Sequence, residues 1–381
     1  MKNNYLTALI LYVFLSLPFG ALATPFNDIF VFGDSLSDQG NVSILTRGTV
    51  PGADYFNGRF SNGPIYTDTL AQNLGLPLTR LAAPILTPPF PSWSPGNGNN
   101  FAYGGARTDG HRSGLPLGLN SQVSAFVNGA VTANNDALYI VFAGANDIQD
   151  AIGVANDNPV EAAAAMANPA GAVAKVENAA VNVAKAISDL AVTGALHFFV
   201  PNGPNWALVP AVNELESNNP ITLAGLSDFA RDVSVAFNSQ LVIELSTIAS
   251  GNPTIDIMYF DFFSLFQDMV DNAANYGFTD VTTSCYEGDD LGFTGGGTAC
   301  TNPDEFLFWD RIHPTTAAHT VFANQFFSAI PEPMSLILFL VGLSGLIIRN
   351  RYLFIWETGS ENINGNSNWK RGQTGNGVRE H

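Results

Sequence analysis

The sequence IFVFGDS occupies residues 29–35 and has the form of a short buried strand followed by a turn. Aromatic and β-branched residues favour strands, and a glycine directly behind such a run favours a turn. Three further apolar runs, at 138–143, 196–200 and 255–260, also end at a glycine, a proline or an aspartate. We therefore expect four short, largely apolar strands.

Helix-forming segments separate these strands. Apolar residues recur at helical spacing in 65–74, 226–249 and 315–329, and an Ala-rich stretch at 161–190 is interrupted at Asn168-Pro169. Strands that alternate with helices form parallel sheets that are covered on both faces. The pattern predicts an α/β fold of three layers, α/β/α, with a central parallel sheet.

The composition favours one large folded region and excludes several kinds of partner. The chain has 381 residues, of which 46% are hydrophobic and 13% charged, whereas disordered chains combine low hydrophobicity with high charge. Its 15 basic and 33 acidic residues give a net charge of −18. Such a surface repels phosphate backbones, so we expect no nucleic-acid partner. Two cysteines are too few for a disulfide-rich scaffold or a four-cysteine zinc site.

The N-terminus has the three parts of a secretory signal peptide. Lys2 precedes an apolar run at 6–19, and the small-residue sequence ALA follows at 21–23. The run is shorter than the ~20 residues of a membrane span, which favours cleavage over retention as a membrane anchor. Residues 1–23 are therefore predicted to be a signal peptide, and residues 24–330 the exported folded domain.

The C-terminus carries a second targeting signal. Residues 331–351 begin with Pro-Glu-Pro, continue through an uncharged apolar run at 334–348 and end with Arg-Asn-Arg. This order resembles the PEP-CTERM sorting signal of bacterial surface proteins, which implies a transmembrane segment and processing by an exosortase. The family signal normally closes the chain, whereas here a polar tail follows at 352–381, rich in Asn and Gly and predicted to be disordered.

Two loop-rich insertions interrupt the strand–helix alternation. The first, at 84–99, carries Phe90 and Trp93, which would either line an apolar pocket or pack on the surface. The second lies between Cys285 and Cys300. In an oxidising compartment these cysteines would form a disulfide, and two free buried thiols are the alternative.

Polar residues follow the first two predicted strands, where open α/β sheets bind ligands. Ser35 comes directly after the first strand and Asn146 after the second, so both are expected to face one crevice. Taken singly, Gly-Asp-Ser and Gly-x-Asn-Asp are ordinary turn sequences. Their significance depends on what accompanies them.

Four motifs occur in order: GDSLSD at 33–38, NFAYGGA at 100–106, GAND at 144–147 and DRIHPT at 310–315. Two further segments accompany them: GRFSNG at 58–63, after the first motif, and NPDEFLFW at 302–309, directly before the last. Together they resemble the GDSL family of lipases and esterases, also called SGNH hydrolases. The resemblance covers roughly 28–327. It implies a flavodoxin-like α/β/α fold and hydrolysis of carboxylic esters.

The resemblance implies that Ser35 is the nucleophile, and a free serine needs a base to take its proton. His313 stands three residues after Asp310 and before a proline, so Asp310 would hold one ring nitrogen while the other faces Ser35. The alternative for this pair is a helix N-terminus capped by Asp310. The other histidines are placed in the tail, on a loop, in a strand core and on a helix: His381, His111, His197 and His319.

Donors for the oxyanion are assigned to the backbone N–H groups of Ser35 and Gly105 and the side-chain amide of Asn146, with Gly104 as the adjacent alternative. Glycine lets the substrate approach the backbone, and Asn donates without adding charge. Turn-holding roles are expected for Asp34, Asp38 and Asp147. No cluster has metal-ligand spacing, and no cofactor is expected.

The predicted function is that of an exported serine esterase or lipase, secreted or held on a bacterial surface, with a Ser-His-Asp triad and an acyl-enzyme. One alternative is a carbohydrate O-acyl esterase or acyltransferase that acts on extracellular polysaccharide. An alternative of another class is a non-catalytic surface or matrix protein on a hydrolase scaffold.

Overall fold

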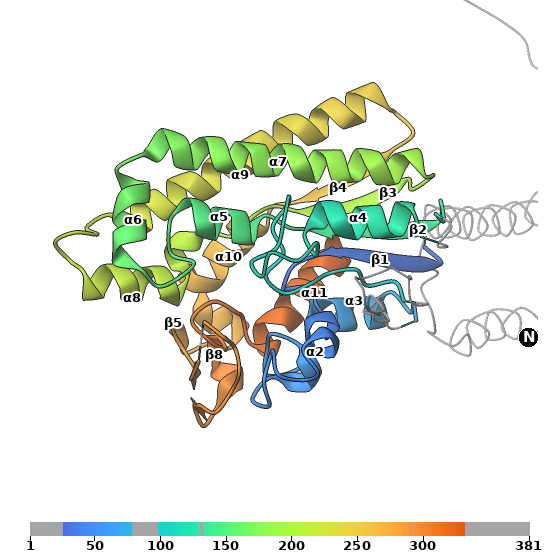
Figure 1. The fold of residues 1–381 in the computed structure, drawn as a ribbon. Helices are drawn as coiled ribbons and strands as arrows, with labels where there is room; N and C mark the ends of the chain where they lie inside the picture. The colour runs from blue at the N-terminus through green and yellow to red at the C-terminus, as the bar shows by residue number, and fades with distance from the viewer. Residues whose placement is uncertain (1–25, 78–97, 130–132, 290, 332–381) are drawn as a thin grey trace, which may run out of the picture. The chain divides into compact units, whose positions relative to one another are not determined.

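The computed structural model describes residues 26–77, 98–129, 133–289 and 291–331 (Figure 1). The described residues all belong to one compact unit. The predicted signal peptide, sorting segment and polar tail lie outside the described residues, as do Phe90 and Trp93.

Four parallel strands form the central sheet in the order β1-β2-β3-β4. Their bounds are β1 Asp28–Gly33, β2 Ala137–Phe142, β3 His197–Pro201 and β4 Asp256–Phe260. Each falls within one or two residues of a predicted strand. β2 is buried along its whole length, as expected for a strand covered on both faces.

Helices cover both faces of this sheet (Figure 1). One layer contains α4 Leu119–Val127, α5 Ala145–Ala151, α7 Pro169–Val192 and α9 Leu226–Gly251. The opposite layer contains α3 Tyr66–Asn73, α10 Phe262–Asp271 and α11 Thr316–Ala329. The predicted three-layer α/β/α fold is therefore confirmed.

The predicted interruption at Asn168-Pro169 separates two helices. α6 Pro159–Met166 ends before it, and α7 begins at Pro169, with the Asn168 side chain accepting the N–H of Gly171. The ring of Pro169 fits the first helical position, where no intrahelical N–H bond is lost.

Short elements join these layers near the site. They are the helices α2 Asn41–Leu45 and α8 Pro210–Asn218, the 3-10 turns η1 Phe56–Gly58, η2 Trp206–Leu208, η3 Ala273–Tyr276 and η4 Pro303–Glu305, the parallel pair β5 Asp280–Ser284 and β8 Phe306–Phe308, and the antiparallel pair β6 Tyr286–Glu287 and β7 Thr298–Ala299.

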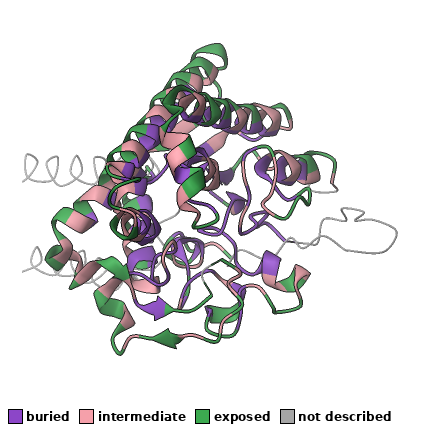
Figure 2. Ribbon diagram, turned by 60° about the vertical axis from the view of Figure 1, so that its left-hand side comes forward, coloured by how far each residue is buried: buried purple, intermediate pink, exposed green. Residues whose placement is uncertain are grey.

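Aromatic side chains connect the sheet to each helical layer. On one face, Phe126 of α4 contacts Phe30 and Phe32 of β1 edge to face. On the other, Phe326 of α11 contacts Phe199 of β3 at a ring-centroid distance of 5.0 Å. β1, β2 and β3 are largely buried, whereas no residue of β4 is. Figure 2 shows buried residues gathered in the interior and exposed ones on the outer helix faces.

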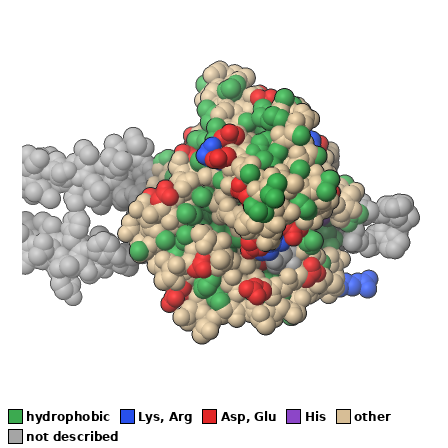
Figure 3. Space-filling model, turned by 90° about the vertical axis from the view of Figure 1, so that its left-hand side faces the viewer, with side chains coloured by type: hydrophobic (Ala, Val, Ile, Leu, Met, Phe, Trp, Pro, Cys, Tyr) green, Lys and Arg blue, Asp and Glu red, His purple; other side chains and the backbone are tan. Residues whose placement is uncertain are grey.

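The surface in Figure 3 carries many more acidic than basic side chains, in keeping with the net charge of −18. Within the four described ranges, we find no helix with the length and apolar character needed to cross a bilayer. The predicted transmembrane run at 334–348 lies outside those ranges.

Candidate active site

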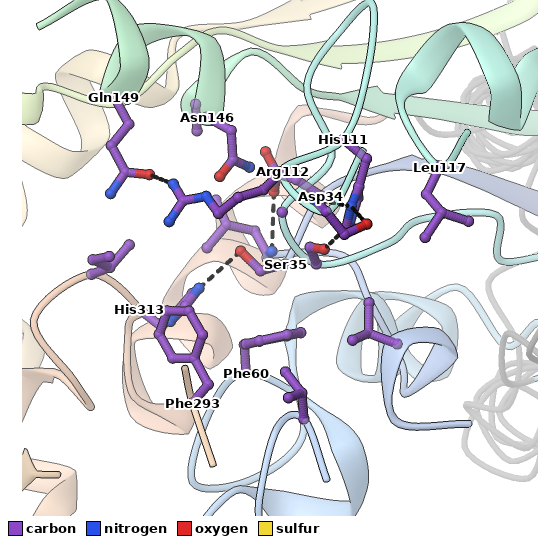
Figure 4. A pocket seen from close by; sticks show the side chains of 18 of the residues that line it. Asp34, Ser35, Phe60, His111, Arg112, Leu117, Asn146, Gln149, Phe293 and His313 are labelled. Atoms are coloured by element: carbon purple, nitrogen blue, oxygen red, sulfur yellow. Dashed lines mark hydrogen bonds between the residues drawn. The ribbon is translucent and has the colours of Figure 1, made fainter. Parts of the chain in front are cut away.

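Ser35 lies in the turn that follows β1, with only 8% of its surface exposed. Gly33 makes this turn possible, because a Cβ at that position would lie 2.3 Å from the carbonyl oxygen of Phe142 in β2. The Ser35 hydroxyl is 2.9 Å from Nε2 of His313 (Figure 4). Residues 278 positions apart in the sequence thus meet at a hydrogen bond.

His313 is in turn bound to Asp310, whose side chain is fully buried. Nδ1 of His313 lies 2.8 Å from Oδ2 of Asp310, while Oδ1 accepts the backbone N–H groups of Ile312 and His313 at 2.8 and 2.6 Å. Burial alone would raise the pKa of Asp310, but the charge of His313 and these hydrogen bonds outweigh it and hold the pKa below its ordinary value. Asp310 is therefore a carboxylate at neutral pH.

The alternative reading of Asp310 as a helix cap does not hold. α11 begins at Thr316, and its cap is Thr315, whose side chain accepts the N–H of Ala318. Asp310 stays free to hold the imidazole ring.

Two aromatic rings confine the His313 imidazole. Phe60 lies 5.1 Å and Phe293 5.2 Å from it, measured between ring centroids. Figure 4 shows both beside His313 at the wall of the cavity. With the imidazole only 4% exposed, its position is set by packing as well as by hydrogen bonds.

Two backbone N–H groups beside the Ser35 hydroxyl, those of Ser35 and Gly105, have no acceptor within the described ranges. The N–H of Gly104 donates instead to Oδ2 of Asp38 at 2.9 Å, so Gly104 is not available as the alternative donor. Gly105 has φ of +79°, a conformation that glycine adopts without strain.

Asn146 lies near the start of α5 and faces the same cavity (Figure 4). Its Nδ2 donates to the carbonyl of Ala106 at 3.0 Å. A primary amide has two N–H bonds, so this contact orients the group and leaves one donor for a ligand.

These groups open onto a cavity of about 340 Å³. Its lining is mainly apolar and comes from segments far apart in the sequence: Val42, Leu45, Val50, Leu115, Leu117, Trp206, Val209, Phe262, Phe266, Leu291 and Ile312. Ligand cavities are typically of this size or larger, with a few polar groups that fix orientation.

The chain matches the family described as GDSL-like Lipase/Acylhydrolase over residues 29–326. The chain belongs to the GDSL family. Acetylajmalan esterase 2 of Rauvolfia serpentina is 28% identical over 77% of this chain and 88% of its own length. A GDSL esterase/lipase of Arabidopsis thaliana is 27% identical over 77% of this chain and 82% of its own. The protein is an ester-bond hydrolase of this family.

The GDSL domain also contains site residues that the sequence did not indicate. The hydroxyl of Tyr55 donates to Oδ2 of Asp310 at 2.9 Å across 255 residues. Gln122 of α4 braces the turn before Ser35, since it accepts the N–H of Gly33 and donates to its carbonyl. The partners in these contacts are 255 and 89 residues apart, so no short sequence motif could have revealed them.

One of the other histidines differs from its predicted environment. His197 is not a core residue: its side chain is 34% exposed at the start of β3, with Nδ1 3.4 Å from Asp256. His319 lies on a helix, as predicted, in α11; it is fully buried, and burial lowers its pKa to about 3. It accepts the N–H of Tyr66 and packs in the core of the GDSL domain. His111 lies on a loop, as predicted, but this loop lines the cavity.

Asp34 and Asp38 hold local turns, as predicted, whereas Asp147 lies in α5 and binds Thr108, 39 residues away. Asp34 accepts the N–H of Leu36, and Asp147 accepts the N–H and hydroxyl of Thr108. Asp38 accepts three N–H groups at the start of α2 as well as that of Gly104. Burial raises the pKa of Asp34 and Asp38 to about 6 and that of Asp147 to about 7.

Cys285 and Cys300 are joined by a disulfide. Cys285 is buried in a small cluster with Tyr55, Tyr286 and Trp309, which places the bridge beside the segment that precedes Asp310. No group of three or more His, Cys, Asp or Glu side chains suited to a metal ion occurs in the part of the chain that the structure describes.

Proposed function

We propose that this GDSL protein hydrolyses carboxylic esters through a Ser35–His313–Asp310 triad. The observation that carries the proposal is the unbroken line of hydrogen bonds from Asp310 through His313 to Ser35, at the wall of an apolar cavity. A serine hydroxyl becomes nucleophilic when a base takes its proton.

In the acylation step, Nε2 of His313 accepts the Ser35 proton while Oγ attacks the ester carbonyl carbon. Asp310 holds Nδ1–H and stabilises the imidazolium that forms. When the tetrahedral intermediate collapses, the C–O bond to the alcohol breaks and His313 returns the proton to the leaving oxygen. Water then repeats the sequence against the acyl-serine, releasing the carboxylic acid and free Ser35.

The negative charge of the tetrahedral intermediate needs donors in place before it develops. The unoccupied N–H groups of Ser35 and Gly105 and the second N–H of Asn146 are suited to this role. All three residues line the same cavity at the carboxyl ends of β1 and β2, which supports their binding one oxyanion together.

The cavity favours a small ester with an uncharged, apolar acyl group. Its volume of about 340 Å³ is near the lower end of the range for small-molecule sites, about 300–1,000 Å³. An apolar lining lowers the free energy of a bound hydrocarbon chain, whereas a charged group placed against this part of the lining would lose its hydration without gaining a partner there.

One polar wall favours a second candidate, a carbohydrate O-acyl esterase or acyltransferase. The guanidinium of Arg112 binds Oε1 of Gln149, and both side chains line the cavity beside Asn146 (Figure 4). Such groups are suited to the hydroxyls of a sugar alcohol part. Release of p-nitrophenol from acetate to palmitate esters, compared with acetate release from acetylated xylan, distinguishes the two candidates. Transfer to an added alcohol would indicate an acyltransferase.

The decisive test of the mechanism is Ser35→Ala together with active-site labelling. The variant should fold and should lose ester hydrolysis, and a serine-directed organophosphonate should label Ser35 alone in the wild type. Labelling of a different serine would refute the triad. A folded wild type that neither reacts with the reagent nor cleaves any ester in the panel would instead support a non-catalytic surface protein.

We also propose that the protein is exported to a bacterial surface or secreted. Support comes from the signal-peptide pattern at 1–23, the PEP-CTERM-like pattern at 331–351 and the disulfide between Cys285 and Cys300, a bond typical of oxidising compartments. An exosortase would be the processing partner. Mass spectrometry of the protein from its host would reveal a mature N-terminus near Thr24 if the first part of this proposal is right.

A further inference from the structure

Three of the four backbone polar groups of Gly104 and Gly105 are already bonded. The N–H of Gly104 donates to Asp38 at 2.9 Å, and the carbonyl of Gly105 accepts the N–H of Arg112 at 3.2 Å. The carbonyl of Gly104 lies 2.7 Å from Nε2 of His111. Only the N–H of Gly105 has no acceptor within the described ranges.

The bond from His111 acts on the peptide group that carries this free N–H. The carbonyl of Gly104 and the N–H of Gly105 belong to one planar unit and point in opposite directions. A contact that holds the oxygen therefore also sets the direction of the N–H. Between two glycines this unit rotates with little steric hindrance, so its orientation depends on such contacts.

The surroundings of His111 also specify which ring nitrogen carries the proton. The backbone N–H of Ser113 lies 3.0 Å from Nδ1, and a backbone N–H only donates. Nδ1 is therefore the acceptor, and Nε2–H is the donor toward Gly104. Burial and the nearby charges of Arg107 and Arg112 lower the pKa of the ring, which favours this neutral form.

Packing reinforces the hydrogen bond. A Cβ built on Gly105 would lie 3.4 Å from Nε2 of His111, and one built on Gly104 would overlap the ring of Phe60 at 2.2 Å. The two glycines therefore lie between the His111 and Phe60 rings, and Phe60 in turn contacts His313.

We propose that His111 is a positioning residue for the oxyanion hole, because it holds the Gly104–Gly105 peptide with the N–H of Gly105 directed at the reacting carbonyl. This inference rests on the proposed function. His111 itself does not contact Ser35 or accept its proton, since His313 already occupies that position.

The test compares two variants of nearly equal size, His111→Gln and His111→Met. Gln places an N–H donor near the position of Nε2, whereas Met fills the space without a donor. Loss of a whole oxyanion donor costs about 100- to 1,000-fold in rate, so a mispositioned one should lower kcat by about 10- to 100-fold. We expect this loss in the Met variant, KM within about twofold of wild type, and recovery of most of kcat in the Gln variant.

Binding of a phenylboronic acid provides a readout that a purely structural role would not change. Its tetrahedral adduct with Ser35 resembles the reaction intermediate, so its Ki should rise in the Met variant by about the same factor as kcat falls. The control is Ser124→Ala on the exposed side of α4, where the hydroxyl donates to the carbonyl of Asn120 in the same helix; this variant should leave kcat and Ki near wild type.

Two outcomes would overturn the inference: a Met variant with kcat within threefold of wild type, or Gln and Met variants with equal losses. The proposed function is judged separately from the wild type, by organophosphonate labelling of Ser35. Labelling at Ser35 with an unaffected Met variant would refute the role of His111 alone.

Discussion

Replacing Asp310 by Asn tests the triad with almost no change in shape. In the wild type Oδ1 accepts the N–H groups of Ile312 and His313, and Oδ2 accepts Nδ1–H of His313 and the Tyr55 hydroxyl. An Asn at this position keeps its oxygen toward the two backbone N–H groups and presents an NH₂ group where Oδ2 was. The Tyr55 hydroxyl can turn and accept from it.

His313 has no such freedom. Facing a donor at Nδ1, the neutral ring must carry its proton on Nε2, which lies 2.9 Å from the Ser35 hydroxyl. Nε2–H cannot accept the proton of Ser35. In serine hydrolases this wrong tautomer lowers kcat by about 10,000-fold, equivalent to about 5.5 kcal/mol of activation free energy. We expect a loss of that size, with KM and Tm close to those of the wild type.

Hydrolysis of a p-nitrophenyl ester, with Tm from circular dichroism, measures both quantities. The matched control is Asp261→Asn, which makes the same isosteric change at the cap of α10, where Asp261 accepts from Ser264. That variant should keep wild-type kcat. A folded Asp310→Asn enzyme that retains more than a tenth of wild-type kcat would show that Asp310 does not set the tautomer of the base.

Three further outcomes are expected. Asn146→Ala should lower kcat by about 100- to 1,000-fold with little change in KM, and an unchanged kcat would remove Asn146 from the oxyanion hole. Replacing Cys285 and Cys300 by Ser should lower the free energy of unfolding by at most about 3 kcal/mol, the chain-entropy value for a loop of 15 residues. Turnover at room temperature should stay the same, and an equal Tm with and without the bridge would contradict this. Burial raises the pKa of Asp147 to about 7, so folding holds a proton there that the unfolded chain releases above pH ~4. The protonated Asp147 therefore stabilises the fold fully below pH ~4, and this stabilisation is lost as the pH rises to about 7. Tm measured from pH 5 to pH 8 should therefore fall less in Asp147→Asn than in the wild type, and identical pH profiles would refute the shift.

The strands and long helices could be predicted because their signals are local. The run at 29–32 is apolar at every position, and Gly33 follows it as a turn signal. Asn168-Pro169 interrupts a helical pattern for a reason contained in two residues. The proposed triad of Ser35, Asp310 and His313 is predicted in the same way, from short motifs whose order and spacing resemble those of a family.

The short helices α4, α5, α8 and α10 were not predicted. Seven to ten residues give too little helical stability to mark a sequence strongly, and in the fold such helices are stabilised by packing of one apolar face. α10 does carry a signal that could have revealed it: Asp261 caps its N-terminus, and Phe262, Phe266 and Met269 lie at helical spacing on its buried face.

The environments of the histidines show where sequence information ends. His197 stands in an apolar run and His319 in a helix next to a catalytic motif, yet His197 is partly exposed and His319 fully buried. The sequence predicts that a strand or a helix forms, but exposure depends on which neighbours cover each face once the sheet is assembled.

The residues of the proposed site likewise fall into those that short motifs predict and those that only the fold brings together. Short motifs are enough to predict Ser35 as the nucleophile and to pair Asp310 with His313, because a loop of three residues suffices to bring Asp310 to His313. The contacts that orient them join Tyr55 to Asp310 across 255 residues and Ser35 to His313 across 278. His111 reaches the carbonyl of Gly104 because the chain between them folds back on itself, with Ala106 paired to His111. The contacts across 255 and 278 residues depend on the order and register of the strands. That arrangement is set by the free energy of the whole core, and no single segment determines it.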